Sequence, residues 1–162
     1  MSHTDIQIRF LDSAEDARVC ARMMAESEPW ISLKRGYQES LKILTEPMRE
    51  VYAARLREEI VGFIVVEMVG TFKGYIKSVC VSPAHRGQGI GSILMNHAEE
   101  RVFSETPNVF LLVSDFNRGA RKLYERLGYE EIGEFKDFIT RGHSEVLMRK
   151  SIGPLSDFMT KR

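Results

Sequence analysis

The sequence has few cysteines and no excess of either charge. Among 162 residues only two are cysteines, Cys20 and Cys80, and no CxxC pair occurs. A disulfide framework is therefore not expected, and a reduced cytoplasm is the expected compartment. Lys plus Arg and Asp plus Glu both number 23. This balance gives no support to a nucleic-acid partner, which usually requires a basic excess.

Long apolar segments are also missing. No run of about 18 apolar residues occurs, so we expect no membrane span and no membrane partner. The stretch MSHTDIQIRF at the start lacks the apolar centre of a signal peptide. The composition is otherwise ordinary, with 43% hydrophobic and 28% charged residues. These values are typical of a soluble globular chain that is long enough to bury a substantial core.

The apolar periodicity predicts a mixed α/β domain over residues 1–150, followed by a C-terminal tail of unplaced structure over 151–162. Alternating or continuous apolar runs predict strands at 6–11, 50–57, 59–70, 75–81, 108–115, 129–135 and 144–150. Helical spacing predicts helices at about 13–25, 37–46, 90–105 and 118–127. The run at 108–115 is almost continuously apolar and predicts burial on both faces. This order of elements does not fit a doubly wound sheet.

Three glycines interrupt the chain where a strand turns into a helix. Gly87, Gly89 and Gly91 follow Arg86 directly, although each glycine inside a helix costs about 1 kcal/mol. A strand-to-helix turn built from glycines leaves several N–H groups directed at one place, and the helix dipole adds positive charge there. With Arg86 and Ser92 alongside, the pattern predicts a phosphate-bearing ligand. The alternative is a tight connection without a ligand, for which one glycine would suffice.

Two common phosphate-binding motifs fit poorly. The P-loop pattern GxxxxGK[ST] is absent, and the dinucleotide pattern GxGxxG lacks its third glycine because Ser92 stands there. Asp115 does lie at a plausible distance beyond, at the end of a predicted strand. A dinucleotide-binding oxidoreductase therefore stays an alternative, weakened by the three or four strands that precede the glycines.

Two motifs together resemble a known family. RGQGIG, residues 86–91, is similar to the R-x-x-G-x-G loop that binds the acetyl-CoA pyrophosphate in the GNAT superfamily of N-acetyltransferases. NRGARKLYERLGY, residues 117–129, resembles the following GNAT motif, N-x-x-[AS]-x-x-x-Y-x-x-x-G-[FY]. The spacing is nearest to that of the ribosomal-protein N-terminal acetyltransferases. The close match covers 75–129, and the order of elements extends it loosely to 6–150.

The resemblance implies a GNAT-type mixed central sheet, flanked by helices, in which two parallel strands splay apart. The strands would be 75–81 and 108–114, and the pantetheine arm of acetyl-CoA would lie between them. An unpaired strand edge can bind the amides of this arm as it would bind another strand. No metal is implied. The implied cofactor-binding residues are Val79, Cys80, Val81, Arg86, Gly87, Gln88, Gly89, Ile90, Gly91, Ser92 and Asn117. The Cys80 thiol itself is expected to be buried and unreactive, because no histidine or cation is near it in sequence.

The implied reaction is direct attack of a primary amine on the acetyl thioester. Tyr124 matches the general-acid position of the family, from which it would protonate the leaving thiolate. On the residues alone, Tyr124 is better explained as part of an apolar helix face with Leu123 and Leu127. Asn117 likewise has a structural explanation as the cap of that helix. In both cases the two roles are compatible.

The proton acceptor is not evident. The nearest relatives carry a glutamate five residues before the asparagine, where this chain has Leu112, which cannot take a proton. Glu67, Asp115, His143 and Glu145 are candidate replacements, and a water chain is another. The missing glutamate also keeps open a non-catalytic module that binds acetyl-CoA as a sensor.

The acceptor side is less defined still. Trp30 follows Pro29 between the first two predicted helices, where it could line an acceptor pocket or fill the core. Glu26 and Glu28 could attract a cationic amine. The sequence does not identify that amine, and a homodimer is an assembly that it leaves open.

Overall fold

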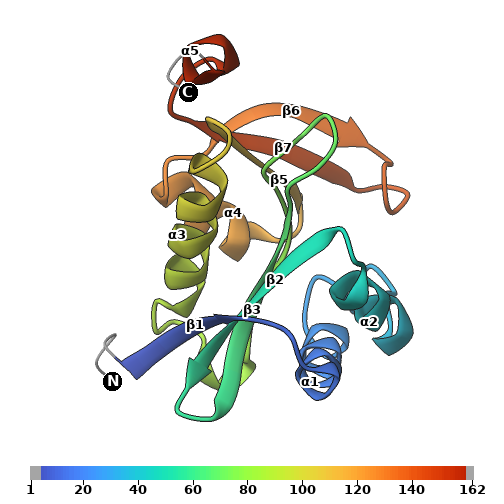
Figure 1. Cartoon of the computed structure of the whole chain (residues 1–162). Coiled ribbons are helices and arrows are strands. Elements are labelled where there is room, and N and C mark those ends of the chain that lie inside the picture. Colours follow the sequence, from blue (N-terminus) through green and yellow to red (C-terminus); the bar gives the residue numbers. More distant parts are fainter. Residues whose placement is uncertain (1–4, 160–162) are drawn as a thin grey trace.

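The computed structural model describes residues 5–159, which form a seven-stranded mixed sheet with helices on both faces (Figure 1). The strands are β1 (Ile6–Phe10), β2 (Arg49–Leu56), β3 (Glu59–Glu67), β4 (Tyr75–Val81), β5 (Asn108–Ser114), β6 (Glu130–Lys136) and β7 (Ser144–Ser151). The helices are α1 (Ala14–Ala25), α2 (Tyr37–Thr45), the short 3-10 turn η2 (Pro83–His85), α3 (Ile90–Phe103), α4 (Arg118–Arg126) and α5 (Leu155–Met159). The predicted order of elements is confirmed from β1 to β7.

The helices begin and end where the sequence predicts, because capping residues satisfy their free backbone groups. The Ser13 side chain accepts a hydrogen bond from the Asp16 amide at the start of α1. The Asn117 side chain accepts one from the Ala120 amide at the start of α4. Gly128 follows α4 with a φ of +92°, a left-handed conformation that favours glycine.

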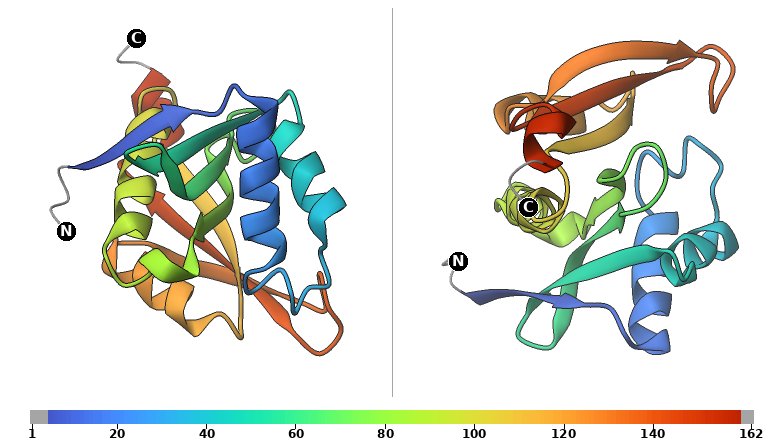
Figure 2. Two further views of the ribbon diagram at one scale, coloured as in Figure 1. Left: turned by 90° about the horizontal axis from the view of Figure 1, so that it is seen from below. Right: turned by 45° about the horizontal axis from the view of Figure 1, so that its top comes forward.

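The strand order is β1-β2-β3-β4-β5-β7-β6, in which only β4 and β5 pair in parallel. Strand β3 is central and buried on both faces. Phe63 and Val65 pack in the apolar core beneath α1 and α2, whereas Ile64 and Val66 pack in the core beneath α3. Figure 2 shows α1 and α2 on one side of the sheet and α3 on the other. The parallel β4–β5 pair interrupts the otherwise antiparallel sheet.

Strands β4 and β5 pair at two positions and then separate. Tyr75 pairs with Phe110 and Ile76 pairs with Leu111, and no further pair joins the two strands. The separation begins at a β-bulge: Val66 and Val65 of β3 oppose Ile76 and Ser78, so Lys77 has no partner on β3. A bulge bends its strand and redirects a side chain. The predicted splay is therefore confirmed.

Two predictions about strands are wrong in detail. Strand β5 is not buried on both faces: Val109, Leu111 and Val113 are buried, but Phe110 and Leu112 are partly exposed. The reason for Leu112 is that the sheet parts beside it. Strand β3 ends at Glu67 rather than at residue 70, since Gly70 turns the chain with a φ of +83°.

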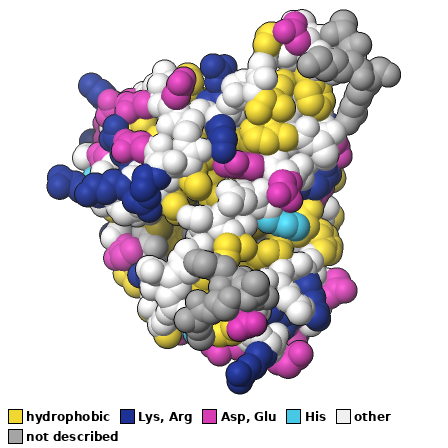
Figure 3. Space-filling view, turned by 90° about the vertical axis from the view of Figure 1, so that its left-hand side faces the viewer, with side chains coloured by type: hydrophobic (Ala, Val, Ile, Leu, Met, Phe, Trp, Pro, Cys, Tyr) yellow, Lys and Arg dark blue, Asp and Glu magenta, His cyan; other side chains and the backbone are white. Residues whose placement is uncertain are grey.

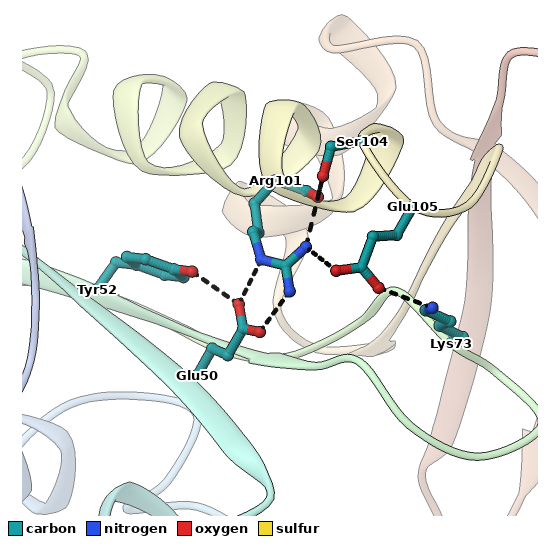
Figure 4. A network of polar contacts seen from close by, with 6 residues as sticks. All are labelled: Glu50, Tyr52, Lys73, Arg101, Ser104 and Glu105. Atoms are coloured by element: carbon teal, nitrogen blue, oxygen red, sulfur yellow. Dashed lines mark hydrogen bonds and ion pairs between the residues drawn. The ribbon is translucent and has the colours of Figure 1, made fainter. Parts of the chain in front are cut away.

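A polar network fastens α3 to the sheet (Figure 4). The Arg101 guanidinium donates to both carboxylate oxygens of Glu50, at 2.8 and 2.6 Å, and to Glu105 at 2.7 Å. Lys73 from the β3–β4 loop forms an ion pair with Glu105 at 2.8 Å, and the Tyr52 hydroxyl donates to Glu50. Hydrogen bonds from Lys73 and then Arg101 lower the pKa of Glu105 to about 2. The network therefore ties the C-terminal end of α3 to β2.

Charges elsewhere on the surface are mixed. In Figure 3, positive and negative side chains alternate over one face of the molecule instead of forming separate patches. None of the helices in the described residues 5–159 is both long and apolar enough to cross a membrane.

Candidate active site

A cavity of about 1010 Å³ opens where β4 and β5 separate. One end is formed by the loop between β4 and α3, and the middle by the two strands and α4. Residues from the α1–α2 loop, the β6–β7 loop and β7 line the rest. The volume lies at the upper end of the range for small-molecule sites, so the cavity can hold a long ligand together with a second small one.

The three glycines of the loop serve two different purposes. Gly87 and Gly89 have φ angles of +71° and +80°, which place them in the left-handed region that side chains disfavour. Gly91 has an ordinary φ, but a Cβ added there would lie 3.3 Å from the Leu123 side chain. Two glycines therefore shape the loop, and the third allows α3 to pack closely on α4. No side chain caps the N-terminus of α3, which lines the cavity and can attract an anion.

The predicted loop residues are brought together with one exception. Arg86, Ile90 and Ser92 line the cavity with the three glycines, and the Arg86 Nε donates to the Val81 carbonyl at 3.2 Å. Gln88 is not among the lining residues, because its side chain donates to the Ala84 carbonyl at 3.4 Å.

The predicted edge of β4 lies in the middle of the cavity. Val79, Cys80 and Val81 line it, beyond the last pair with β5, so none of the strands within residues 5–159 covers this edge. The Cys80 side chain packs into the α1–α2 core, where its thiol lies 3.9 Å from the Met23 carbonyl. Burial raises the pKa of Cys80 to about 11, so the thiol is protonated at neutral pH. The expectation that the thiol is buried is confirmed, and its raised pKa favours low reactivity.

Tyr124 belongs both to the core and to the cavity. Its side chain is 8% exposed, its ring lies 5.9 Å from that of Tyr129, and it lines the cavity from α4. Burial, with a smaller contribution from Tyr75, raises the pKa of Tyr124 to about 12. The hydroxyl therefore carries its proton at neutral pH. Asn117 lines the cavity too while it caps α4, so its two predicted positions are compatible.

Of the four candidate proton acceptors, Glu145 alone lines the cavity. Glu67 forms an ion pair with Arg49 at 2.8 Å, outside the lining. Asp115 and His143 contact each other at 3.1 Å and also lie outside it. Geometry thus reduces the four candidates to one.

Glu145 has the environment of a proton acceptor. It lies on β7 opposite Ser114, is 4% exposed, and accepts a hydrogen bond of 2.7 Å from the Ser114 hydroxyl. Burial and then the nearby Asp115 charge raise the pKa of Glu145, against the opposing effects of Ser114, Arg35 and His143. A carboxylate with a raised pKa takes up a proton more readily than an ordinary one. Leu112 lines the same cavity and supplies only apolar surface.

Several lining residues have no signature in the sequence. Arg35, Tyr75, Lys77, Phe138 and Ile139 line the cavity, and none of them belongs to a motif. A lysine within the apolar strand YIKSVCV is the one signal that sequence reasoning could have used.

Of the three residues predicted on the acceptor side, two line the cavity and one does not. Trp30 is 6% exposed, packs in the α1–α2 core and lines the cavity, so both expectations for it hold. Glu28 lines the cavity as well. Glu26 does not: it lines a second cavity with residues such as Arg55 and Ser82, so its predicted place in the acceptor pocket is wrong.

Comparison with known proteins agrees with this geometry. A sequence model of the acetyltransferase (GNAT) family matches residues 14–129. The N-alpha-acetyltransferase RimI of Mycobacterium tuberculosis is 26% identical over 125 residues, which cover 73% of this chain and 75% of that protein. A GNAT-family structure from Desulfovibrio desulfuricans superposes with a TM-score of 0.79 at 17% identity, over 91% of this chain and 99% of that one. An aminoglycoside 6'-N-acetyltransferase complexed with coenzyme A superposes with a TM-score of 0.76 at 20% identity, over 91% and 98%.

The fold is that of an acyltransferase, and because the family model matches most of the chain, the chain belongs to the GNAT family of acetyltransferases. It is an acetyl-CoA-dependent N-acetyltransferase, and its acceptor is an amine. The antiparallel order of β1 to β4 excludes the doubly wound sheet that the dinucleotide alternative requires.

Proposed function

We propose that this enzyme acetylates a primary amine by direct attack, with Glu145 as the proton acceptor and Tyr124 as the proton donor. The observation that carries the proposal is their placement. A buried carboxylate and a protonated tyrosine, from β7 and α4, line the same cavity between the splayed strands. The first can remove the proton of the ammonium group, and the second can protonate the leaving thiolate.

The cofactor is assigned to the other part of the cavity. The pyrophosphate lies at the N-terminus of α3 beside Arg86, where unpaired N–H groups and the helix dipole favour an anion. The pantetheine arm runs along the uncovered edge of β4. The residues assigned to acetyl-CoA are Val79, Cys80, Val81, Arg86, Gly87, Gly89, Ile90, Gly91, Ser92 and Asn117, with Gln88 acting through its backbone N–H alone.

The reaction then balances as follows. An alkyl ammonium has a pKa of about 10 and must lose a proton, which Glu145 accepts. The free amine forms a bond to the thioester carbon, and the oxyanion accepts a hydrogen bond from a backbone N–H within residues 79–81. Collapse of this intermediate breaks the C–S bond, and Tyr124 protonates the thiolate. The nitrogen, which is cationic after the attack, passes its second proton through solvent to Tyr124. The products are the N-acetylated amine and coenzyme A, and Glu145 releases its proton to solvent.

A matched pair of variants tests the proton acceptor. Glu145→Gln keeps the size of the side chain and its contact with Ser114, and should lower kcat by about 10²- to 10⁴-fold. Glu67→Gln removes a carboxylate that lies outside the cavity and should change kcat by less than about threefold. The wild type should also lose activity as pH falls through the raised pKa of Glu145, because the protonated acid accepts no proton. Equal kcat values for wild type and Glu145→Gln would remove Glu145 from the mechanism.

Three broader expectations complete the proposal. Residues 1–150 act as one catalytic domain, and 151–162 follow it as a C-terminal tail. The two buried free thiols, Cys20 and Cys80, are consistent with a cytoplasmic enzyme. We expect no nucleic-acid or membrane partner, and a homodimer is the assembly to test, by light scattering of the purified protein.

A further inference from the structure

Two cations line the part of the cavity that is remote from the glycine loop. Lys77 lies four residues before Val81 on β4, roughly 13 Å along an extended strand. The charge of Arg35 acts on Tyr75, on Lys77 and on Glu145, which places its guanidinium at the same end. This end, lined by Arg35, Lys77, Glu28 and Glu145, is called the acceptor end below.

The segment that carries Arg35 is held on both sides. The Arg35 amide donates to the Trp30 carbonyl at 2.9 Å, and Lys34 has a φ of +54°. The next residue, Gly36, donates its amide to the Glu39 carboxylate at 2.7 Å and caps α2. The direction in which the Arg35 side chain leaves the backbone is thus fixed by the fold.

Arg35 and Lys77 have no carboxylate partner among the described residues. No carboxylate within residues 5–159 forms an ion pair or a side-chain hydrogen bond with Arg35 or Lys77, although both side chains are half-buried. Burial lowers the pKa of Lys77, while Glu67 acts in the opposite direction. Glu67, however, is already bonded to Arg49. An unpaired, partly desolvated guanidinium binds a carboxylate strongly, because its planar donors match the two oxygens.

We propose that the acceptor is a free amino acid, whose carboxylate binds Arg35 with the charge of Lys77 beside it while its amine faces Glu145. This inference rests on the proposed function. The acceptor end contains both acids and bases, so each charge of a zwitterion meets groups of the opposite sign. A doubly charged phosphate would meet Glu28 and Glu145, and an acceptor with positive groups alone would be repelled by Arg35 and Lys77.

The test compares each acceptor with its uncharged partner. The kcat/KM for acetylation is measured for the common amino acids and for their carboxamides, together with diamines. Since acids and amides differ in the pKa of their amines, the quantity of interest is the change in the acid-to-amide ratio between variants. Arg35→Gln should lower this ratio at least about tenfold, which corresponds to about 1.4 kcal/mol. Lys34→Gln removes the same charge one residue away, outside the cavity lining, and should leave the ratio unchanged.

The outcomes separate the two levels of the proposal. The protein could acetylate amides or diamines while Arg35→Gln leaves the acid-to-amide ratio of kcat/KM unchanged. This result would overturn the amino-acid acceptor and leave the direct-attack mechanism intact. An equal fall in both variants would show a general effect of charge, and would also overturn it. If the protein binds acetyl-CoA but acetylates no member of the panel, the amino-acid acceptor is overturned, and the Glu145→Gln comparison of the proposed function is made with other amines.

Discussion

The two ends of the cavity are built in different ways. At the end that we assign to the cofactor, the candidate binding groups are backbone amides, presented by Gly87, Gly89, the start of α3 and the uncovered edge of β4. At the acceptor end they are side chains from distant segments: Arg35 precedes α2, Lys77 lies in a bulge, and Glu145 lies on β7. The first end suits a ligand that every member of the family shares, whereas the second can change by single substitutions.

Tyr124 lies between the part of the cavity assigned to the cofactor and the acceptor end, and its substitution should have the largest effect on kcat in this series. Tyr124→Phe should lower kcat by roughly 10- to 100-fold and leave the affinity for acetyl-CoA unchanged, because the ring still packs against Tyr129. The benefit is at the low end of the range for proton transfer since a thiolate is already a fair leaving group. Single-turnover rates with an accepted amine measure the effect.

Tyr75→Phe is the matched control for Tyr124. Burial raises the pKa of Tyr75 to about 12, and Tyr75 lines the same cavity, so both hydroxyls are protonated at neutral pH. A fall in the single-turnover rate for Tyr75→Phe and none for Tyr124→Phe would transfer the role of acid to Tyr75.

The next effect tests the cofactor loop. Gly87 and Gly70 both have positive φ angles, and a Cβ added at either would contact no atom within 4 Å. Alanine at either position should therefore destabilise the fold by a similar amount, about 1–2 kcal/mol. Gly87→Ala alone should also weaken acetyl-CoA binding, by about tenfold, because its Cβ lies where the pyrophosphate approaches. Titration calorimetry provides the affinities, and equal affinities in the two variants would show that the loop does not hold the cofactor.

A smaller effect is expected at Arg86. Its side chain is exposed, so Arg86→Ala should weaken acetyl-CoA binding only by a few-fold. The loss should be absent for a pantetheine fragment without phosphate, since the guanidinium acts on the anion. Losses of the same size for both ligands would indicate that the bond from Arg86 to the Val81 carbonyl matters instead.

The smallest effect on the site is expected from the polar network that holds α3 on the sheet, because substitutions there act on the stability of the fold. Although burial opposes it, Arg101 lowers the pKa of Glu50, and Lys73 and Arg101 lower that of Glu105. Acids with lowered pKa values stabilise the fold above their ordinary pKa and lose this contribution as pH falls. Arg101→Met should therefore flatten the loss of unfolding free energy between about pH 5 and about pH 2. Arg121→Met, at an exposed pair with Glu125, should change this acid dependence much less.

The two ends of the cavity also differ in how far the sequence predicts them. Apolar periodicity and caps such as Ser13 and Asn117 act locally, so the elements and their order could be predicted. The shape of the glycine loop could be predicted as well, because its left-handed backbone requires glycine at particular positions. The acceptor end could not, since Arg35 and Glu145 are brought together only by the tertiary fold. The wrong expectation for Glu26 has this cause, as does the partial exposure of β5 beside the splay.

The most direct test of this account measures binding and turnover separately in Glu145→Gln. If the cofactor and the chemistry occupy different ends of the cavity, titration calorimetry should give a Kd for acetyl-CoA within about twofold of the wild type, while kcat falls by at least about 10²-fold. A loss of acetyl-CoA affinity as large as the loss of kcat would contradict the account, because it would mean that Glu145 supports the cofactor and not the transfer of the amine proton.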